Sequence, residues 1–164
     1  MVHRLPTREQ YLEYYKIIYL ENNLDLFKKT YEYIENNDNN KILDFKYKYF
    51  TKIGGSTQKY RYHEFFHYVK VLYKIYSLVK YSKNFEDLIK KIYALKFSDI
   101  NKNIYMPLDR LYFEPNQLKE NEDSLLMFFL ISKWMGLKPN NEYKNYFKKI
   151  EKLLKETKFT GQFN

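Results

Sequence analysis

Residues 58–82 read QKYRYHEFFHYVKVLYKIYSLVKYS, and their spacing predicts a long helix. Aromatic and aliphatic side chains recur every three or four positions, as expected for a helix that buries one wide face. That face would consist of Tyr62, Phe65, Phe66, Val69, Leu72, Tyr73, Tyr76 and Val79. Five basic or imidazole side chains fall within about 80° of one another on the other side of such a helix. They are Lys59, His63, His67, Lys70 and Lys74.

The segments on either side of this stretch also favour helices. Helical spacing is visible from Thr7 to Tyr19, in a second segment from Leu24 to Ile34, and over residues 84–97, 122–136 and 141–157. Gly136 is expected to end the segment 122–136, because glycine readily adopts the left-handed conformation that closes helices.

Two further segments are less regular. Residues 98–121 contain Pro107 and Pro115 and are expected to form an irregular connector. Residues 41–53 fit either a helix or a strand, and we favour a helix because no partner strand is evident. The sequence therefore predicts an all-α fold: a single orthogonal bundle of five to seven helices, in one domain covering residues 1–164.

The positive charge of the chain is concentrated in one quarter of it. Residues 41–83 hold ten Lys or Arg and two acids, a net charge of +8, whereas the whole chain carries +9. The same segment holds twelve Phe or Tyr residues. Basic residues interleaved with aromatics are typical of surfaces that contact phosphates and unpaired bases.

This charge pattern predicts a nucleic-acid interface. Lysine and arginine would neutralise phosphates and release counterions, without reading bases. The expected contact residues are Lys46, Lys48, Lys52, Lys59, Arg61, His63, His67, Lys70 and Lys74. The expected partners are RNA and neighbouring proteins of a large assembly, the latter meeting exposed tyrosines.

Composition excludes some classes of function. The chain has no cysteine, which rules out disulfides, Cys-metal sites and thiol catalysis. Its longest apolar run, residues 125–132, is shorter than the roughly 20 residues needed to span a bilayer. We therefore expect no transmembrane segment, and the N-terminal residues show no import signal.

The composition also resembles that of a recognisable class of proteins. The chain has 19 Tyr and 13 Phe, with Ala94 as its single alanine, and its lysines greatly outnumber its arginines. It resembles proteins encoded by AT-rich mitochondrial genomes, those of ciliates in particular, and also proteins of some phages and large DNA viruses. The resemblance implies a mitochondrial protein on the matrix side, such as a subunit of the mitochondrial ribosome. The alternative location is the cytoplasm of a phage- or virus-infected cell.

A five-residue motif suggests a different chemistry. His63-Glu64-Phe65-Phe66-His67 matches H-E-x-x-H, which on a helix places two imidazoles one turn apart, as a zinc site requires. It resembles the zincin metallopeptidases. By that resemblance His63 and His67 would bind zinc, Glu64 would be the general base, and Glu86 or Asp87 would complete the site. The interpretation that we favour assigns no cofactor and no catalytic residue.

Two further alternatives remain. Arg61 and His67 have a spacing that resembles the Arg-x5-His motif of the higher eukaryote and prokaryote nucleotide-binding ribonucleases, which are metal-independent, all-helical and basic. That resemblance implies roles for both residues at the scissile phosphate. Alternatively, the basic segment would face lipid headgroups or an acidic partner, in a peripheral subunit of a mitochondrial respiratory membrane complex.

Overall fold

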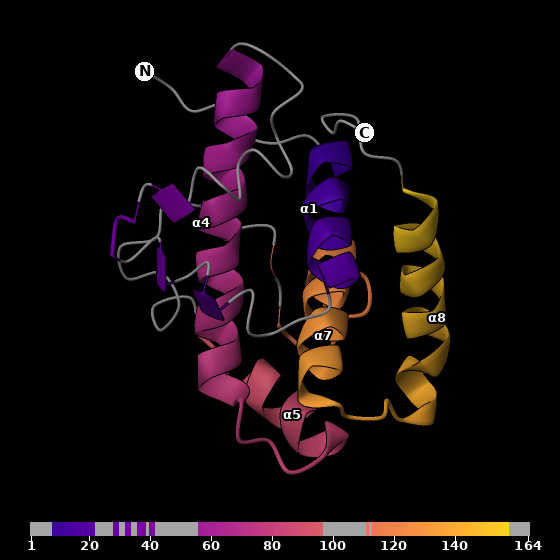
Figure 1. Cartoon of the computed structure of the whole chain (residues 1–164). Helices are drawn as coiled ribbons and strands as arrows, with labels where there is room; N and C mark the ends of the chain where they lie inside the picture. The colour runs from indigo at the N-terminus through magenta and orange to yellow at the C-terminus, as the bar shows by residue number, and fades with distance from the viewer. Residues whose placement is uncertain are drawn as a thin grey trace. The chain divides into compact units, whose positions relative to one another are not determined.

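The computed structural model is all-α over the residues that it describes, and those residues contain no strand. It describes residues 8–21, 28–29, 32–33, 36–38, 40–41, 56–96, 111 and 113–157, with only the backbone at 8–11, 20–21 and 56–67. The helices over this part are α1 (Arg8–Glu21), α4 (Ser56–Val79), α5 (Phe85–Tyr93), α7 (Glu122–Met135) and α8 (Asn141–Glu156) (Figure 1). The predicted fold class is therefore confirmed.

Some sequence predictions lie on residues that the structure does not describe. The choice between helix and strand for residues 42–53 is one of them. Of the helix expected between Leu24 and Ile34, residues 28–29 and 32–33 are described, and they are helical. Of the expected connector, residues 111 and 113–121 are described, and they form turns and irregular backbone rather than a regular helix.

The chain divides into two compact units. One consists of residues 1–70 and 156–164, and the other of residues 71–155. Helix α4 runs through the boundary at Lys70. That the whole chain is one domain remains a prediction.

In the N-terminal unit, α1 buries several of its apolar side chains. Tyr14, Tyr15 and Ile18 are fully buried. Tyr15 meets Tyr68 of α4 edge to face, with ring centroids 5.0 Å apart, and the two hydroxyls are hydrogen bonded. These contacts attach α1 to the part of α4 that belongs to the same unit. Lys16 also donates a hydrogen bond to the carbonyl oxygen of Thr157.

In the C-terminal unit, α7 is the central helix. Every residue from Ser124 to Ser132 is buried, as expected for a helix that is apolar nearly all round and packed on several sides. Helices α7 and α8 lie side by side in opposite directions, joined by residues 136–140 (Figure 1). Gly136 ends α7 with φ +65°, as predicted from its position.

An aromatic cluster holds three helices of this unit together. Phe128 of α7 stacks on Phe85 of α5, with ring centroids 5.2 Å apart, and meets Tyr143 and Phe147 of α8 edge to face. Such pairs stabilise a core by about 0.5–1.5 kcal/mol each beyond their buried area. Burial, together with a 3.0 Å hydrogen bond to the hydroxyl of Tyr93, raises the pKa of Tyr143, so its hydroxyl stays neutral.

Asparagine side chains cap these three helices. Asn84 accepts a hydrogen bond from the Asp87 N–H (2.9 Å) at the start of α5. Asn121 accepts one from the Ser124 N–H (2.9 Å) at α7, and Asn140 one from the Tyr143 N–H (3.1 Å) at α8. Asparagine is among the best N-cap residues because its side chain satisfies a backbone donor that the helix leaves unpaired. The caps explain where the three helices begin.

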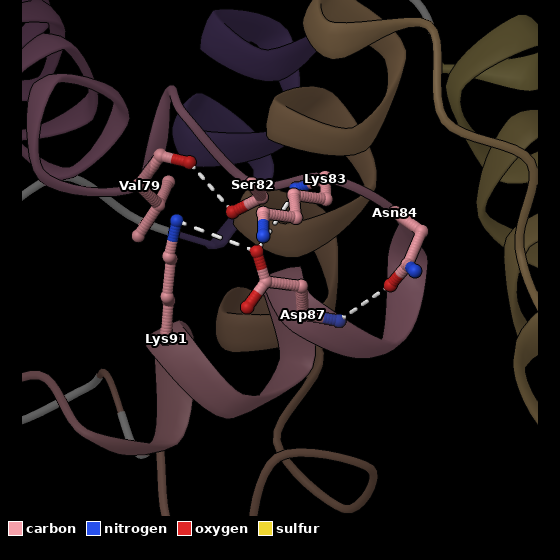
Figure 2. A network of polar contacts seen from close by, with 6 residues as sticks. All are labelled: Val79, Ser82, Lys83, Asn84, Asp87 and Lys91. Atoms are coloured by element: carbon pink, nitrogen blue, oxygen red, sulfur yellow. Dashed lines mark hydrogen bonds and ion pairs between the residues drawn. The ribbon is translucent and has the colours of Figure 1, made fainter.

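The turn between α4 and α5 is fixed by a polar network around Asp87. Figure 2 shows the Asp87 carboxylate accepting a hydrogen bond from the Lys83 N–H (2.9 Å) and lying 3.4 Å from the ammonium of Lys91. Ser82 closes the end of α4 by donating to the Val79 carbonyl oxygen (2.7 Å). The Lys83 hydrogen bond, and then the charge of Lys91, hold the pKa of Asp87 below its ordinary value of 3.8.

The network predicts a pH-dependent contribution to stability. Because folding lowers the pKa of Asp87, the contribution is present above pH 3.8, the ordinary value, and is lost as the pH falls through the folded-state pKa. We expect Asp87→Asn to lower the free energy of unfolding at pH 7, and the difference from the native chain to shrink below about pH 4. Urea denaturation at pH 7, 5 and 3 measures it. A difference that stays constant over this range would contradict the assignment.

Candidate nucleic-acid interface on helix α4

Helix α4 contains most of the predicted contact residues, so its buried and exposed sides decide how they can act. It runs without interruption from Ser56 to Val79. Among the side chains described, six are buried, and they cover an arc of about 160° around the helix axis. They are Tyr68, Val69, Val71, Leu72, Ile75 and Val79.

The buried face differs in part from the predicted one. Val69, Leu72 and Val79 are buried as expected. Tyr73 and Tyr76 are only half-buried, and Tyr76 lies at the edge of the face, where it contacts Trp134 of α7. Tyr68, Val71 and Ile75 are buried although the sequence pattern did not include them. The centre of the face is therefore rotated relative to the predicted stripe.

The predicted row of cations occupies positions away from this buried arc. Helical geometry places positions 59, 63, 67, 70 and 74 within an arc of about 80°, whose centre is about 160° from the centre of the buried arc. Lys70 and Lys74 are both half-buried. Among the residues that the structure describes, Lys74 forms no ion pair.

Of the remaining predicted contact residues, four are described by their backbone alone and three lie outside the described residues. Lys59, Arg61, His63 and His67 lie in the helical backbone of α4. Lys46, Lys48 and Lys52 lie outside the described residues. The structure thus places the predicted contact positions from 59 to 74 on one helix. That Lys46, Lys48 and Lys52 also contact RNA remains a prediction.

The position of Arg61 lies on a different side of α4 from the row of cations at positions 59, 63, 67, 70 and 74. Its position is 120° from that of His67 around the helix, and it coincides within about 20° with the positions of Leu72 and Val79, which are buried. An Arg-His pair that acts on one phosphate needs both groups within reach of the same atom. The register therefore gives no support to the ribonuclease alternative.

The H-E-x-x-H motif lies inside α4, so the positions of His63 and His67 are one turn apart on one side of a continuous helix. Glu86, the third ligand of that alternative, is exposed in α5 and accepts a 2.5 Å hydrogen bond from the Asn140 side chain. Among the described residues, no three His, Asp or Glu side chains are grouped so as to hold a metal ion.

Membrane insertion is not indicated by any helix in the described ranges. None of them is both long enough and apolar enough to cross a bilayer. The apolar run at residues 125–132 instead forms the buried middle of α7.

Sequence reasoning missed a cavity at the C-terminal end of α7. Phe128 and Phe129 are both buried in the core of the C-terminal unit. Phe129, however, also lines a cavity of about 430 Å³, together with residues on the loop that follows Gly136. The sequence feature that could have indicated this cavity is the group of lysines on both sides of that loop. These lysines are recognised as one group only once α7 and α8 are known to be antiparallel neighbours.

Comparison of the chain with protein families, with curated proteins and with solved structures found no match.

Proposed function

We propose that this chain is a non-catalytic, basic helical subunit of a large ribonucleoprotein assembly, and that α4 contacts RNA phosphates. One observation carries the proposal. The positions of Lys59, Lys70 and Lys74 fall on one side of a continuous helix, and the side chains known to be buried lie on the other.

A row of this kind suits a phosphate backbone. From position 59 to position 74 it extends about 22 Å along the axis, which matches about six nucleotides of a stacked strand. A half-buried lysine such as Lys74 can cover apolar surface with its methylene chain while the ammonium group reaches out. The contacts would position the protein on RNA without reading its sequence.

The assembly that we favour is a mitochondrial ribosome. The support for this is the compositional resemblance to proteins encoded by AT-rich mitochondrial genomes, together with the concentration of charge in residues 41–83. A large assembly also accounts for exposed aromatic side chains such as Tyr81, which is 79% exposed, because tyrosine is enriched at protein interfaces.

The direct experiment is a titration of the full chain with labelled single-stranded RNA at several salt concentrations, followed by fluorescence anisotropy. If about four to six phosphates are neutralised, raising the salt from 50 to 200 mM should weaken binding by about 50- to 300-fold. Poly(A) and poly(U) should bind within a few-fold of each other. No binding at 50 mM salt, or binding that salt does not affect, would refute the proposal.

A second candidate function is zinc-dependent hydrolysis. The observation that favours it is that His63 and His67 occupy positions one turn apart on a continuous helix, with Glu64 between them. In that case the purified chain should contain about one zinc ion per molecule, detected by elemental analysis. His63→Ala should remove the metal, whereas Glu64→Gln should keep it and abolish peptide hydrolysis. A chain that remains free of metal after incubation with zinc would end this candidate.

A vesicle-binding measurement, run beside the RNA titration, distinguishes the respiratory-complex alternative from the ribonucleoprotein. A peripheral subunit of a respiratory complex would sediment with vesicles that contain anionic lipid, since each lysine near such a surface contributes about 1 kcal/mol of attraction. Sedimentation with vesicles but no association with RNA would favour that alternative over the ribonucleoprotein.

A further inference from the structure

The cavity at the end of α7 lies wholly within the C-terminal unit. It has a volume of about 430 Å³ and is bounded by residues 129–133 of α7, the loop that follows α7, and residues 144–151 of α8. Phe129 and Phe147, whose rings meet edge to face at 5.4 Å, form part of its wall, and Leu137 and Pro139 extend the apolar surface along the loop. Its size and apolar lining are those of pockets that bind small molecules.

One polar group in the wall has no hydrogen-bond partner among the residues that the structure describes. Ser132 is 2% exposed and lines the cavity, and its hydroxyl makes no hydrogen bond within this described part. A serine in a helix usually donates to the carbonyl four residues earlier, and a buried hydroxyl without any partner costs free energy. The hydroxyl oxygen itself has almost no accessible surface, so an occupant of the cavity would receive a hydrogen bond from Ser132 only after the side chain rotates toward it.

The rim of the cavity is strongly cationic. Four lysines line it, against the single acid Glu151; they are Lys133, Lys138, Lys144 and Lys148. Glu151 lies 3.9 Å from Lys133 and 3.2 Å from Lys155, so its charge is already shared between two ammonium groups. The other three rim lysines are exposed, and they form no ion pair with the residues that the structure describes. An apolar wall with a cationic rim complements a molecule that is apolar at one end and anionic at the other.

We propose that this cavity binds an amphipathic anion that has an acyl chain and a single carboxylate or phosphate head group. The chain would lie against Phe129, Phe147 and Leu137, and the head group would face the lysines. A nucleotide fits the lining less well. Its base needs several hydrogen-bonding partners, and the only neutral polar side chain in the wall is that of Ser132. The site is separate from the RNA interface proposed on α4.

Isothermal titration calorimetry of the full chain with decanoate and with dodecyl phosphate tests the site. We expect one bound anion per chain. Octanoate should bind up to about tenfold more weakly than decanoate, because two buried methylene groups are lost. Decanol, which lacks the charge, should bind more weakly than decanoate. Binding of AMP at the same concentrations that exceeds binding of decanoate would show that the ligand class is wrong.

Paired lysine variants separate the rim from general surface charge. The double variant Lys144→Gln/Lys148→Gln should weaken decanoate binding by about three- to tenfold, since exposed charge pairs contribute modestly. The matched control, Lys149→Gln/Lys152→Gln, removes two exposed lysines of the same helix that do not line the cavity, and should change binding by less than about twofold. Equal loss in both variants would overturn the proposal.

Blocking the cavity gives an independent result. Leu137→Trp should abolish binding of both anions while circular dichroism shows unchanged helix content. Should that variant fold poorly, Ser132→Ala removes only the hydroxyl, and it should weaken decanoate binding several-fold. If neither variant alters binding, the anion binds elsewhere and the site is refuted.

The ligand could be free in solution or part of a membrane, and the source is distinguished with vesicles. Vesicles of phosphatidylcholine containing lysophosphatidic acid present the same head group within a bilayer. Binding of soluble decanoate and dodecyl phosphate, without sedimentation with these vesicles, identifies a carrier of free amphiphiles. Sedimentation that Lys144→Gln/Lys148→Gln reduces, and that the control pair leaves intact, identifies a contact with membrane lipid through the same cavity.

Discussion

Replacing Lys59, Lys70 and Lys74 together by glutamate is expected to abolish association with RNA and to leave the helix content intact. The three positions lie within the same narrow arc of α4, so the change turns a row of positive charge into a row of negative charge. Attraction to the phosphates becomes repulsion. At 50 mM salt we expect affinity to fall by more than about 100-fold.

The salt dependence provides a second readout for the same variant. Losing three phosphate contacts should reduce the slope of log K against log salt by about 2, because each contact on a single strand contributes about 0.7. Charge-neutral replacements by glutamine at the same positions should give an intermediate affinity and a similarly reduced slope. Fluorescence anisotropy with single-stranded RNA measures both quantities.

A matched control is available in the C-terminal unit. Lys90, Lys149 and Lys152 are exposed lysines of α5 and α8, and replacing all three by glutamate changes the net charge by the same amount. If RNA is bound through α4, this control should lose affinity only through the weaker long-range field of the protein. Equal loss of affinity in the two triple variants would show that total charge matters, and not the row on α4.

Phe128→Ala is expected to have the largest effect on stability. The Phe128 ring is fully buried and contacts Phe85, Tyr143 and Phe147, which belong to the two helices packed against α7. Its removal loses the transfer free energy of a phenyl ring and leaves a cavity between three helices. We expect the free energy of unfolding to fall by about 3–5 kcal/mol. That amounts to a large part of the total stability of a typical domain.

Urea denaturation followed by circular dichroism measures this loss. Tyr81→Ala is the matched control: it also removes an aromatic ring, but Tyr81 is 79% exposed, and its contact with Lys80 lies at the surface. We expect the control to change stability by no more than about 0.5 kcal/mol. A Phe128→Ala chain as stable as the native one would show that the aromatic cluster does not hold α5, α7 and α8 together.

Two helices of the C-terminal unit could be predicted from the sequence nearly to the residue. The expected segments 122–136 and 141–157 correspond to α7 (Glu122–Met135) and α8 (Asn141–Glu156). Both helices begin at asparagine caps, and α7 ends at Gly136 in the left-handed conformation, so these limits are set locally. The segment 84–97 was predicted too long, since α5 ends at Tyr93.

For the candidate nucleic-acid interface, the sequence could predict which positions of α4 form the row, but not how their side chains are buried. The spacing from Lys59 to Lys74 indicated a row of cations, and the continuity of α4 keeps those positions in register. The sequence pattern could not show which side chains of α4 are buried. Tyr68, for example, is buried because Tyr15 of α1 packs against it. The cavity beside Ser132 was also unpredictable, because its walls come from two helices and a loop whose packing no local pattern encodes.

The sequence by itself determined that this protein is helical, where several of its helices begin and end, and that most of its net charge lies within residues 41–83. These properties depend on interactions between residues a few positions apart, which periodicity and capping reveal. Only the tertiary structure decided which face of α4 is buried, how Phe85, Phe128 and Tyr143 meet, and where a cavity remains. Those features depend on contacts between residues far apart in the chain, whose geometry is fixed only when the helices pack.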